Sequence, residues 1–403
     1  MSLNAERSYK MKLRDVENAF KYRRIPYPKR SVELIALLAI SCTFFLFMHT
    51  NKLNSRLKEM EVKLQPSEFS ALGLTGNHIS GHDAGKHDDI NTLHGTYQYL
   101  KSTGQLWRLN PKFLNNTKFH TGDVIYYNRV PKTGSETLIE LMIQLGERNQ
   151  FQNERAPFSK PVGIYWSTER QHQEAMRIME LQEDFAFVYA EHMNYMNLRP
   201  FHLPQPIYIN MVRDPVERVI SWFYYKRTPW NSVKMFKVNG QFQNRSHYLK
   251  NFEDCVLTRD PECRYDYGLM FKDDPSDHKR QSLFFCGHSP ICEPFNTPAA
   301  IARAKQNVER DYSVVGSWED VNVTLTVLEK YIPRYFKGSM ELYYEPINGL
   351  AFKRQNINHW KPQISERIKR IMRANFTQEY DFYYFCKQRL YRQYFAINRH
   401  LHF

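Results

Sequence analysis

Beyond residue 120, short apolar runs alternate with segments in which apolar residues recur at helical spacing. The apolar runs have the length of strands and cover residues 124–128, 186–190, 207–212 and 313–316. The helical segments cover residues 137–145, 215–225 and 321–331. This alternation predicts an α/β domain with a central parallel sheet flanked by helices. Because the strand runs are apolar throughout, we expect both faces of the sheet to be buried, with ligands at the carboxyl ends of the strands.

An uncharged apolar run at residues 34–48 dominates the amino-terminal part of the chain. Residues 32–49 therefore predict a single transmembrane signal anchor. A secretory signal peptide and a buried helix are the alternatives, although no small-residue cleavage site follows the run. Residues 1–31 contain nine Lys or Arg against three acidic residues, which predicts a cytosolic tail and a luminal position for everything after the anchor.

Residues 50–120 are expected to form a luminal stem, followed by a luminal domain at residues 121–403. A four-three-four spacing of apolar residues just after the anchor fits a brief coiled coil or an amphipathic stem helix. These residues are Leu53, Leu57, Met60 and Leu64. Residues 65–116 are rich in Gly, His, Asn and Ser, which favours a flexible segment.

The formal net charge of the chain is +14, and most of the excess follows the predicted anchor. A basic luminal surface fits an acidic polymer. We expect no nucleic acid as partner, because the topology separates the domain from nucleic acid and the sequence has no nucleic-acid-binding motif. The chain also lacks a carboxylate cluster with metal-ligand spacing, so we expect no metal.

Cysteines and glycosylation acceptors fit an oxidising luminal compartment. Four luminal cysteines bracket two short segments: Cys255, Cys263, Cys286 and Cys292. Two local disulfides are the simplest pairing, although three connectivities are possible and a zinc site that includes His288 stays open. The remaining luminal thiol, Cys386, is buried, free or intermolecular. Four Asn-x-Ser/Thr acceptors require surface exposure for glycosylation: Asn115, Asn244, Asn322 and Asn375.

A small-residue loop joins the apolar run at 124–128 to the amphipathic helix that follows it. Such a loop forms an anion cradle, because backbone amides at a helix start face the ligand. The expected amides belong to Thr133, Gly134, Ser135 and Glu136, with Lys132 as point charge and the hydroxyls of Ser135 and Thr137 as further donors. Lys132 precedes the single glycine, so the order differs from a nucleotide triphosphatase loop. The motif predicts another phosphate-bearing donor.

A second loop follows the run at 207–212, which ends at Arg213 and turns directly into a helix. Asp214, Pro215 and Glu217 fit the N-cap, N1 and N3 positions, which resembles a capping box. Ser221 returns to the same helix face nearly two turns later, so Arg213 and Ser221 are positioned to hold a second phosphate. The alternative is structural: Arg213 pairs with a carboxylate and Ser221 is a helix-surface hydroxyl.

Three motifs together resemble the uronyl 2-O-sulfotransferases, and most closely their insect Pipe-like members. They lie at residues 128–137, 207–218 and 284–289, and the resemblance covers residues 121 to the carboxyl end. It implies a P-loop-like sulfotransferase fold and 3′-phosphoadenosine 5′-phosphosulfate (PAPS) as donor. By resemblance, residues 132–137 bind the 5′-phosphosulfate, while Arg213 and Ser221 bind the 3′-phosphate. The family also implies a Golgi type II membrane protein, a glycosaminoglycan-like acceptor and a homo-oligomer, which is a trimer in the heparan sulfate enzyme.

His192 is the candidate catalytic base. It follows the apolar run at 186–190, on the side of the sheet where ligands are expected. The resemblance places a catalytic histidine at this position, which would deprotonate a uronic acid 2-hydroxyl while Lys132 stabilises charge on the leaving phosphate. The heparan sulfate enzyme has another histidine two positions earlier, where this chain has Ala190, so the choice of glycan stays open.

Basic residues near the motifs are candidates for contacts with carboxylates and sulfates of the acceptor. They are Arg129, Lys226, Arg227, Lys353 and Arg354. The aromatic run at 380–385 is expected to pack a terminal helix on the sheet and has no assigned catalytic role. Two other functions stay open: a sulfotransferase acting on another hydroxyl or on glycoprotein glycans, and a non-catalytic glycan-binding relative.

Overall fold

The computed structural model describes residues 41, 48–49, 89–120, 123–155, 166–180, 185–270, 279–345 and 361–398. The expected cytosolic tail, nearly all of the expected anchor at 32–49 and the first part of the expected stem lie outside these residues. Within the described ranges, no helix is both long and apolar enough to span a bilayer.

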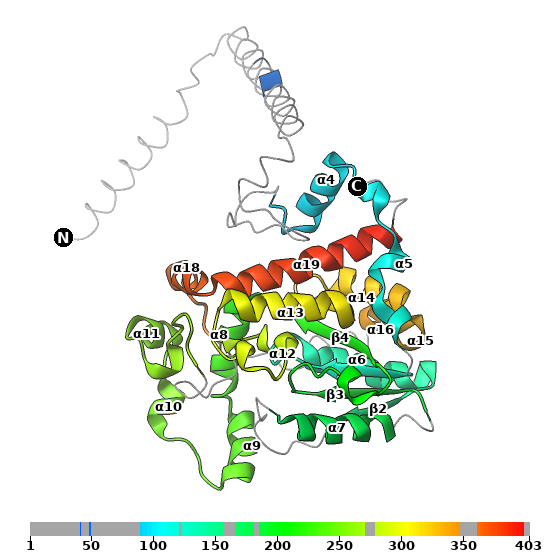
Figure 1. Cartoon of the computed structure of the whole chain (residues 1–403). Coiled ribbons are helices and arrows are strands. Elements are labelled where there is room, and N and C mark those ends of the chain that lie inside the picture. Colours follow the sequence, from blue (N-terminus) through cyan, green and yellow to red (C-terminus); the bar gives the residue numbers. More distant parts are fainter. Residues whose placement is uncertain are drawn as a thin grey trace, which may run out of the picture. The chain divides into compact units, whose positions relative to one another are not determined.

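The domain is built on a five-stranded sheet with the order β2-β3-β1-β4-β5 (Figure 1). All strand pairs are parallel, which confirms the predicted sheet. The strands are β1 (Val124–Asn128), β2 (Gln152–Arg155), β3 (Phe187–Glu191), β4 (Ile207–Val212) and β5 (Tyr312–Ser317). The sequence did not predict β2, because this edge strand is polar and lacks the apolar run that marks the other four strands.

Both faces of the sheet are buried, as the continuous apolar runs predicted. Helices α7 (Thr168–Glu180), α8 (Pro215–Tyr225) and α13 (Pro298–Asp311) contribute to the core on one face. Helices α6 (Ser135–Asn149) and α14 (Val321–Tyr331) contribute to the core on the other. Register aligns four buried tyrosines in one row across β3, β1, β4 and β5: Tyr189, Tyr126, Tyr208 and Tyr312. Adjacent strands therefore meet through aromatic cross-strand pairs, which stabilise the sheet.

Residues 89–120, placed in the expected flexible stem, are instead largely helical. They form α4 (Leu93–Ser102), η1 (Leu106–Arg108), α5 (Pro111–Leu114) and η2 (Asn116–Phe119). Tyr97 and Leu100 are buried in the same core as α6 and α14, and α4 packs against the long carboxyl-terminal helix α19 (Thr377–Ile397). The polar composition of this segment led to the expectation of a flexible stem. A few widely spaced apolar residues are nevertheless enough to pack a short helix on an existing core.

The remaining helices lie between β3 and the carboxyl end. They are η3 (Arg199–Phe201), α9 (Pro229–Asn239), α10 (Arg245–Leu249), α11 (Phe252–Leu257), η4 (Pro261–Cys263), α12 (Leu283–Cys286), η6 (Pro290–Cys292), α15 (Pro333–Phe336), α16 (Ser339–Tyr344) and α18 (Glu366–Asn375). Helices α13 and α19 run side by side over the sheet (Figure 1). The aromatic run at 380–385 lies in α19 and is largely buried, so its predicted role in packing is confirmed.

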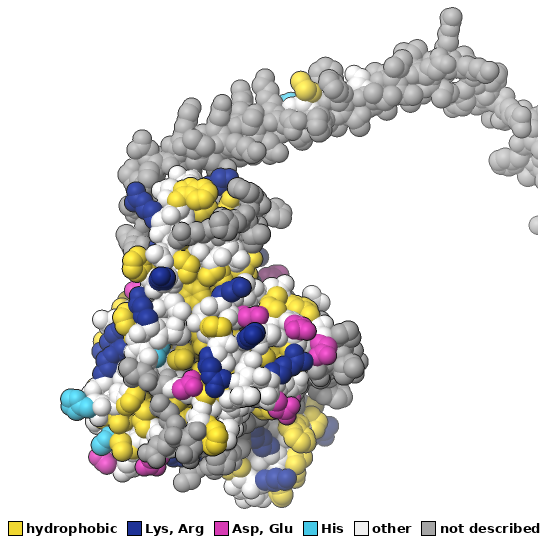
Figure 2. All heavy atoms as spheres, turned by 90° about the vertical axis from the view of Figure 1, so that its right-hand side faces the viewer, with side chains coloured by type: hydrophobic (Ala, Val, Ile, Leu, Met, Phe, Trp, Pro, Cys, Tyr) yellow, Lys and Arg dark blue, Asp and Glu magenta, His cyan; other side chains and the backbone are white. Residues whose placement is uncertain are grey.

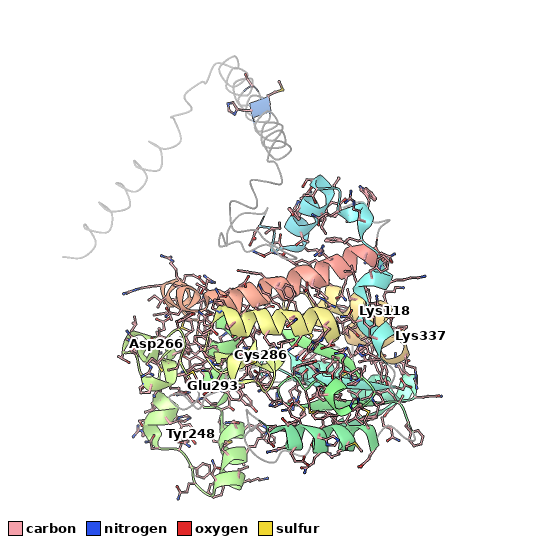
Figure 3. The ribbon with its side chains drawn as sticks, in the orientation of Figure 1. Lys118, Tyr248, Asp266, Cys286, Glu293 and Lys337 are labelled. Atoms are coloured by element: carbon pink, nitrogen blue, oxygen red, sulfur yellow. A yellow bond between two sulfur atoms is a disulfide. The ribbon has the colours of Figure 1, made fainter. Side chains whose placement is uncertain are left out.

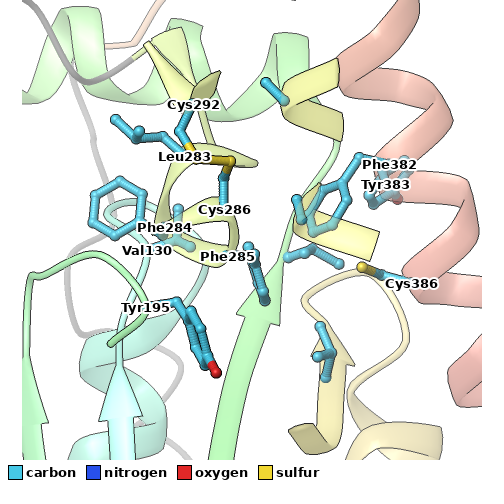
Figure 4. Close-up of a cluster of buried hydrophobic side chains, with 14 of the residues drawn as sticks. Val130, Tyr195, Leu283, Phe284, Phe285, Cys286, Cys292, Phe382, Tyr383 and Cys386 are labelled. Carbon is cyan, nitrogen blue, oxygen red and sulfur yellow. A yellow bond between two sulfur atoms is a disulfide. The ribbon is translucent and has the colours of Figure 1, made fainter. Parts of the chain in front are cut away.

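Two disulfides connect the local pairs expected as the simplest connectivity. Cys255 bonds to Cys263 and Cys286 bonds to Cys292. The second disulfide lies beside Leu283 and Phe284 in the buried cluster drawn in Figure 4. Cys386 of α19 is a buried free thiol in the same core.

Surface charge is dispersed on the face that Figure 2 shows. On the face in Figure 2, Lys and Arg side chains are scattered among acidic and hydrophobic ones. In Figure 3, Lys118 and Lys337 lie on one side of the domain, away from Tyr248 and Asp266. The net charge alone therefore does not locate an acceptor site. The residues at the carboxyl ends of the strands are the better guide to it.

Candidate active site

The loop after β1 has the backbone of an anion cradle. Lys132 and Gly134 have left-handed backbones, with φ of 65° and 81°, and α6 begins at Ser135. A Cβ atom at Gly134 would lie 1.9 Å from Cε3 of Trp318, so both φ and the close aromatic ring require glycine. The hydroxyl of buried Thr133 donates to the Val130 carbonyl at 2.9 Å, which closes the turn. The first amides of a helix have no acceptor within the helix, so the start of α6 can present N–H groups to an anion.

Lys132 and Arg213 meet at this loop, although they are distant in sequence. Nη1 of Arg213 donates to the Lys132 carbonyl oxygen at 3.2 Å. The Lys132 ammonium lies 4.2 Å from the centroid of the Tyr225 ring on α8. Burial, followed by the charge of Arg213, lowers the pKa of Lys132 to about 8, against an opposing effect of Glu136. Two cations held this close favour a bound anion between or beside them.

The turn after β4 has the predicted helix cap. Asp214 Oδ1 accepts from the Glu217 amide at 2.9 Å. Glu217 does not complete the capping box in return, because its carboxylate pairs with Lys361 and Lys369 at 2.7 and 2.8 Å. Burial alone would raise the pKa of Glu217, but the two lysines lower it to about 2. Ser221 is buried on α8, and its joint role with Arg213 stays a prediction.

His192 lies directly after β3, the sheet neighbour of β1. Its Nδ1 is 2.9 Å from the carbonyl oxygen of Arg129, the first residue of the cradle loop. A carbonyl can only accept, so Nδ1 carries the proton and donates. In the neutral ring the lone pair then lies on Nε2, which is the arrangement that a general base needs. The ends of β3, β1 and β4 thus bring together His192, Lys132 and Arg213.

The candidate acceptor-binding cations have partners within the domain. Arg129 is buried and pairs with Glu136 at 2.5 Å, which fixes the cradle loop. Arg227 pairs with Glu262 through both terminal nitrogens, at 3.1 and 2.6 Å, and Lys226 lies 2.9 Å from the same carboxylate. These pairs explain the positions of the three cations without an acceptor. Lys353 and Arg354 lie outside the described residues.

The sequence did not single out three residues at the strand ends. Trp318 follows β5 and covers Gly134, and its position after an apolar run was a signal that could have found it. Gln281 Oε1 accepts from the Arg213 amide at 3.3 Å. Glu319 Oε1 accepts from the Asp214 amide at 2.9 Å. Gln281 and Glu319 reach the β4 turn from distant segments, so no local pattern marks them.

The structure also decides between the alternatives for the cysteines. Cys255, Asp260 and Glu262 lie close enough to share a metal ion, but the Cys255 sulfur is in a disulfide and offers no thiolate. All four paired cysteines are oxidised, which argues against the zinc site left open above.

The four glycosylation acceptors differ in exposure. Asn244, Asn322 and Asn375 are exposed. Asn115 is half-buried and its Nδ2 donates to the Tyr331 carbonyl at 3.2 Å, so this amide is held by the fold. Glycosylation remains a prediction, and the geometry favours the first three positions.

Comparison with known proteins identifies the family. Residues 115–385 match the sulfotransferase family. The uronyl 2-sulfotransferase homolog pip of Drosophila melanogaster is 46% identical over 99% of this chain and 95% of its own length. The chain belongs to the uronyl 2-sulfotransferase family.

More distant members of the family align over a shorter part of the chain. Human uronyl 2-sulfotransferase is 27% identical over 69% of this chain and 65% of its own length. Human heparan sulfate 2-O-sulfotransferase 1 is 30% identical over 55% of this chain and 58% of its own length. The higher identity with pip agrees with the Pipe-like resemblance of the motifs. The cradle loop after β1 and the turn after β4 both lie within residues 115–385, the part of the chain that matches the sulfotransferase family.

Proposed function

We propose that this protein transfers a sulfuryl group from PAPS to the 2-hydroxyl of a uronic acid in a glycosaminoglycan-like chain. By family resemblance, it works as a type II Golgi membrane protein with its catalytic domain in the lumen, and as a homo-oligomer. Membership of the sulfotransferase family supports the reaction class. The arrangement of side chains at the strand ends supports the assignment of roles.

The residues at the cradle fit a donor that carries two phosphate groups. Lys132 and the first amides of α6 face one position, and Arg213 extends the positive charge to the β4 turn. Nε of Arg213 is buried and has no hydrogen-bond partner in the part of the chain that the structure describes. A buried donor without an acceptor costs about 1–3 kcal/mol. Phosphate oxygens would remove this cost, and their charge would offset the proximity of Lys132 and Arg213.

His192 is proposed as the general base. Nε2 removes the proton of the acceptor hydroxyl while that oxygen forms its bond to sulfur, and the bond between sulfur and the 5′-phosphate oxygen breaks. PAPS supplies the sulfuryl group and leaves as 3′,5′-ADP. Lys132 and the amides of α6 stabilise the charge that develops on the departing phosphate. Arg129 orients the base, because its carbonyl holds Nδ1 of His192.

One observation carries this proposal. The loop that forms the anion cradle also supplies, through the Arg129 carbonyl, the hydrogen bond that fixes the His192 ring. Donor site and base are therefore held by a single loop. A non-catalytic glycan-binding protein needs no general base, so it would have no use for a His192 ring held in this tautomer.

The test incubates the purified full chain with labelled PAPS and, separately, desulfated heparan, chondroitin and dermatan. The products are then digested and the sulfate is mapped. We expect label on the uronate 2-position, ranked by acceptor. His192→Ala should retain 3′,5′-ADP affinity within about threefold and lose on the order of 10²- to 10⁴-fold in transfer. His94→Ala, on an exposed position of α4, is the matched control and should remain active.

Other outcomes would change the assignment. Near-normal turnover of His192→Ala would exclude it as base. Nucleotide binding without transfer to any of the three chains would favour another acceptor, such as a glycoprotein glycan. Absence of nucleotide binding by the wild type would refute the enzyme function and favour a glycan-binding relative.

A further inference from the structure

We propose that Gln281 is a donor-binding residue whose side-chain amide donates to the phosphate held by Arg213. This inference rests on the proposed function and extends its donor site. In that function the phosphate is the 3′-phosphate of PAPS. Gln281 comes from the segment before α12 and reaches the tip of β4 from a different part of the chain.

The orientation of the Gln281 amide follows from its hydrogen bond. The partner at 3.3 Å is the main-chain N–H of Arg213, which can only donate, so the side-chain oxygen must face it. Nε2 then points away from this bond. Gln281 is fully buried, and its Nε2 has no acceptor among the described residues. Nε of Arg213 is in the same condition. Two buried donors without acceptors therefore occur on hydrogen-bonded residues beside the cradle.

Gln281 is held in place from the carboxyl-terminal helix. Glu379 of α19 is fully buried, and its Oε2 accepts from the amides of Gln281 and Ser282 at 3.1 and 3.2 Å. Its other oxygen accepts from the Ser282 hydroxyl. These three bonds hold the backbone from which the Gln281 side chain extends. Burial raises the pKa of the Glu379 carboxyl group, and the bonds oppose that effect because they favour its ionised form.

The same helix also braces the other side of the β4 turn. The Tyr380 hydroxyl donates to Asp214 Oδ2 at 2.8 Å. The Tyr383 hydroxyl donates to Glu319 Oε2 at 3.0 Å, and Glu319 accepts from the Asp214 amide. The aromatic run at 380–385, for which no catalytic role was expected, therefore contributes to positioning Arg213 and its neighbours.

A purely structural role for Gln281 would require only its oxygen. The oxygen accepts from the Arg213 amide, but the buried Nε2 would then stay desolvated with no acceptor among the described residues. An anion at Arg213 gives Nε2 an acceptor and makes the hydrogen bond charge-assisted. The two interpretations differ in which atom acts: direct contact uses Nε2 on the phosphate itself, whereas a structural role acts only through the Arg213 amide.

The experiment compares the affinities of 3′,5′-ADP and 5′-AMP by calorimetry on the full chain. The wild type should prefer 3′,5′-ADP. Gln281→Met preserves side-chain length and removes both polar atoms. We expect it to lose about 10- to 100-fold in affinity for 3′,5′-ADP and less than about threefold for 5′-AMP. Gln281→Asn keeps an amide but shortens the side chain, and it is the second variant in case the methionine variant does not fold. It should also lose preference for 3′,5′-ADP over 5′-AMP.

Gln388→Met is the matched control. Gln388 is a buried glutamine of α19 whose Nε2 donates to Asn91 Oδ1 at 2.7 Å. This variant should keep the wild-type ratio of affinities. A wild-type ratio in Gln281→Met or Gln281→Asn, within about twofold, would overturn the inference and leave the proposed function intact. Failure of the wild type to bind either nucleotide would overturn both.

Discussion

Binding of 3′,5′-ADP should take up a proton on Lys132. In the free protein, burial and then Arg213 lower the pKa of this lysine to about 8. An anionic phosphate beside the ammonium favours the charged form and raises the pKa by about 1–3 units. The lysine is about half protonated at pH 8 in the free state and nearly fully protonated in the complex. Binding should therefore take up about 0.1 proton at pH 7, about 0.4–0.5 at pH 8 and about 0.4–0.9 at pH 9, the upper values belonging to the larger pKa shift.

Titration calorimetry in buffers of different ionisation enthalpy measures this uptake directly. At each pH, the observed enthalpy plotted against buffer ionisation enthalpy has a slope equal to the number of protons exchanged. The affinity should also fall as pH rises above about 8, because the neutral lysine must be charged on binding. Lys132→Arg is the control, since a guanidinium stays protonated throughout this range and should show no uptake.

Two results would refute this reasoning. Uptake below about 0.1 proton at pH 8 would mean that Lys132 is fully charged before the nucleotide binds. Equal uptake by the wild type and Lys132→Arg would assign the proton to another group. Either result would also remove the argument that Arg213 and Lys132 form one anion site.

Two further predictions concern stability. Gly134→Ala should lower stability in thermal unfolding by well more than the roughly 1 kcal/mol cost of a left-handed alanine, and it should abolish nucleotide binding. Gly338→Ala is the control, because Gly338 has a φ of 80° and a Cβ atom there would meet no atom within 4 Å. It should show only the backbone cost. Burial opposes ionisation of Glu262, but Arg227 and a neighbouring lysine lower its pKa to about 2, so this carboxylate stabilises the fold above pH 4.5 and loses that effect as pH falls to 2. Glu262→Gln should cost about 2–3 kcal/mol in denaturant unfolding at pH 7 and flatten the acid dependence; an unchanged acid profile would contradict this.

Local patterns predicted the elements that carry the site. The four apolar runs became β1, β3, β4 and β5, and the helix at 215–225 has the bounds that its cap and spacing indicated. These elements were predictable because burial on both faces requires a continuous apolar run, and a cap is a contact between residues three positions apart. The helix after the cradle, Ser135–Asn149, is longer than the expected 137–145. The expected range was too short because the residues after 145 are mostly polar and lack the apolar spacing.

Elements and contacts without a local pattern were missed. The polar edge strand β2 and the helices within residues 89–120 owe their positions to packing against elements elsewhere in the chain. The expected acceptor contacts of Lys226 and Arg227 were inferred from charge alone, and their shared partner Glu262 is 35 residues from Arg227. A sequence shows that a side chain is cationic, but only the fold shows which carboxylate it meets.

The sequence by itself determined the parallel sheet, the cradle loop with its glycine, the capped turn after Arg213 and the histidine after β3, because each depends on residues within a few positions of one another. Tertiary structure decided that Lys132 and Arg213 touch, that the Arg129 carbonyl sets the tautomer of His192, and that Glu379 holds Gln281 beside Arg213. Those contacts join segments 63 to 98 residues apart. They exist because adjacent parallel strands end at one edge of the sheet and the first turns of α19 pack against that edge.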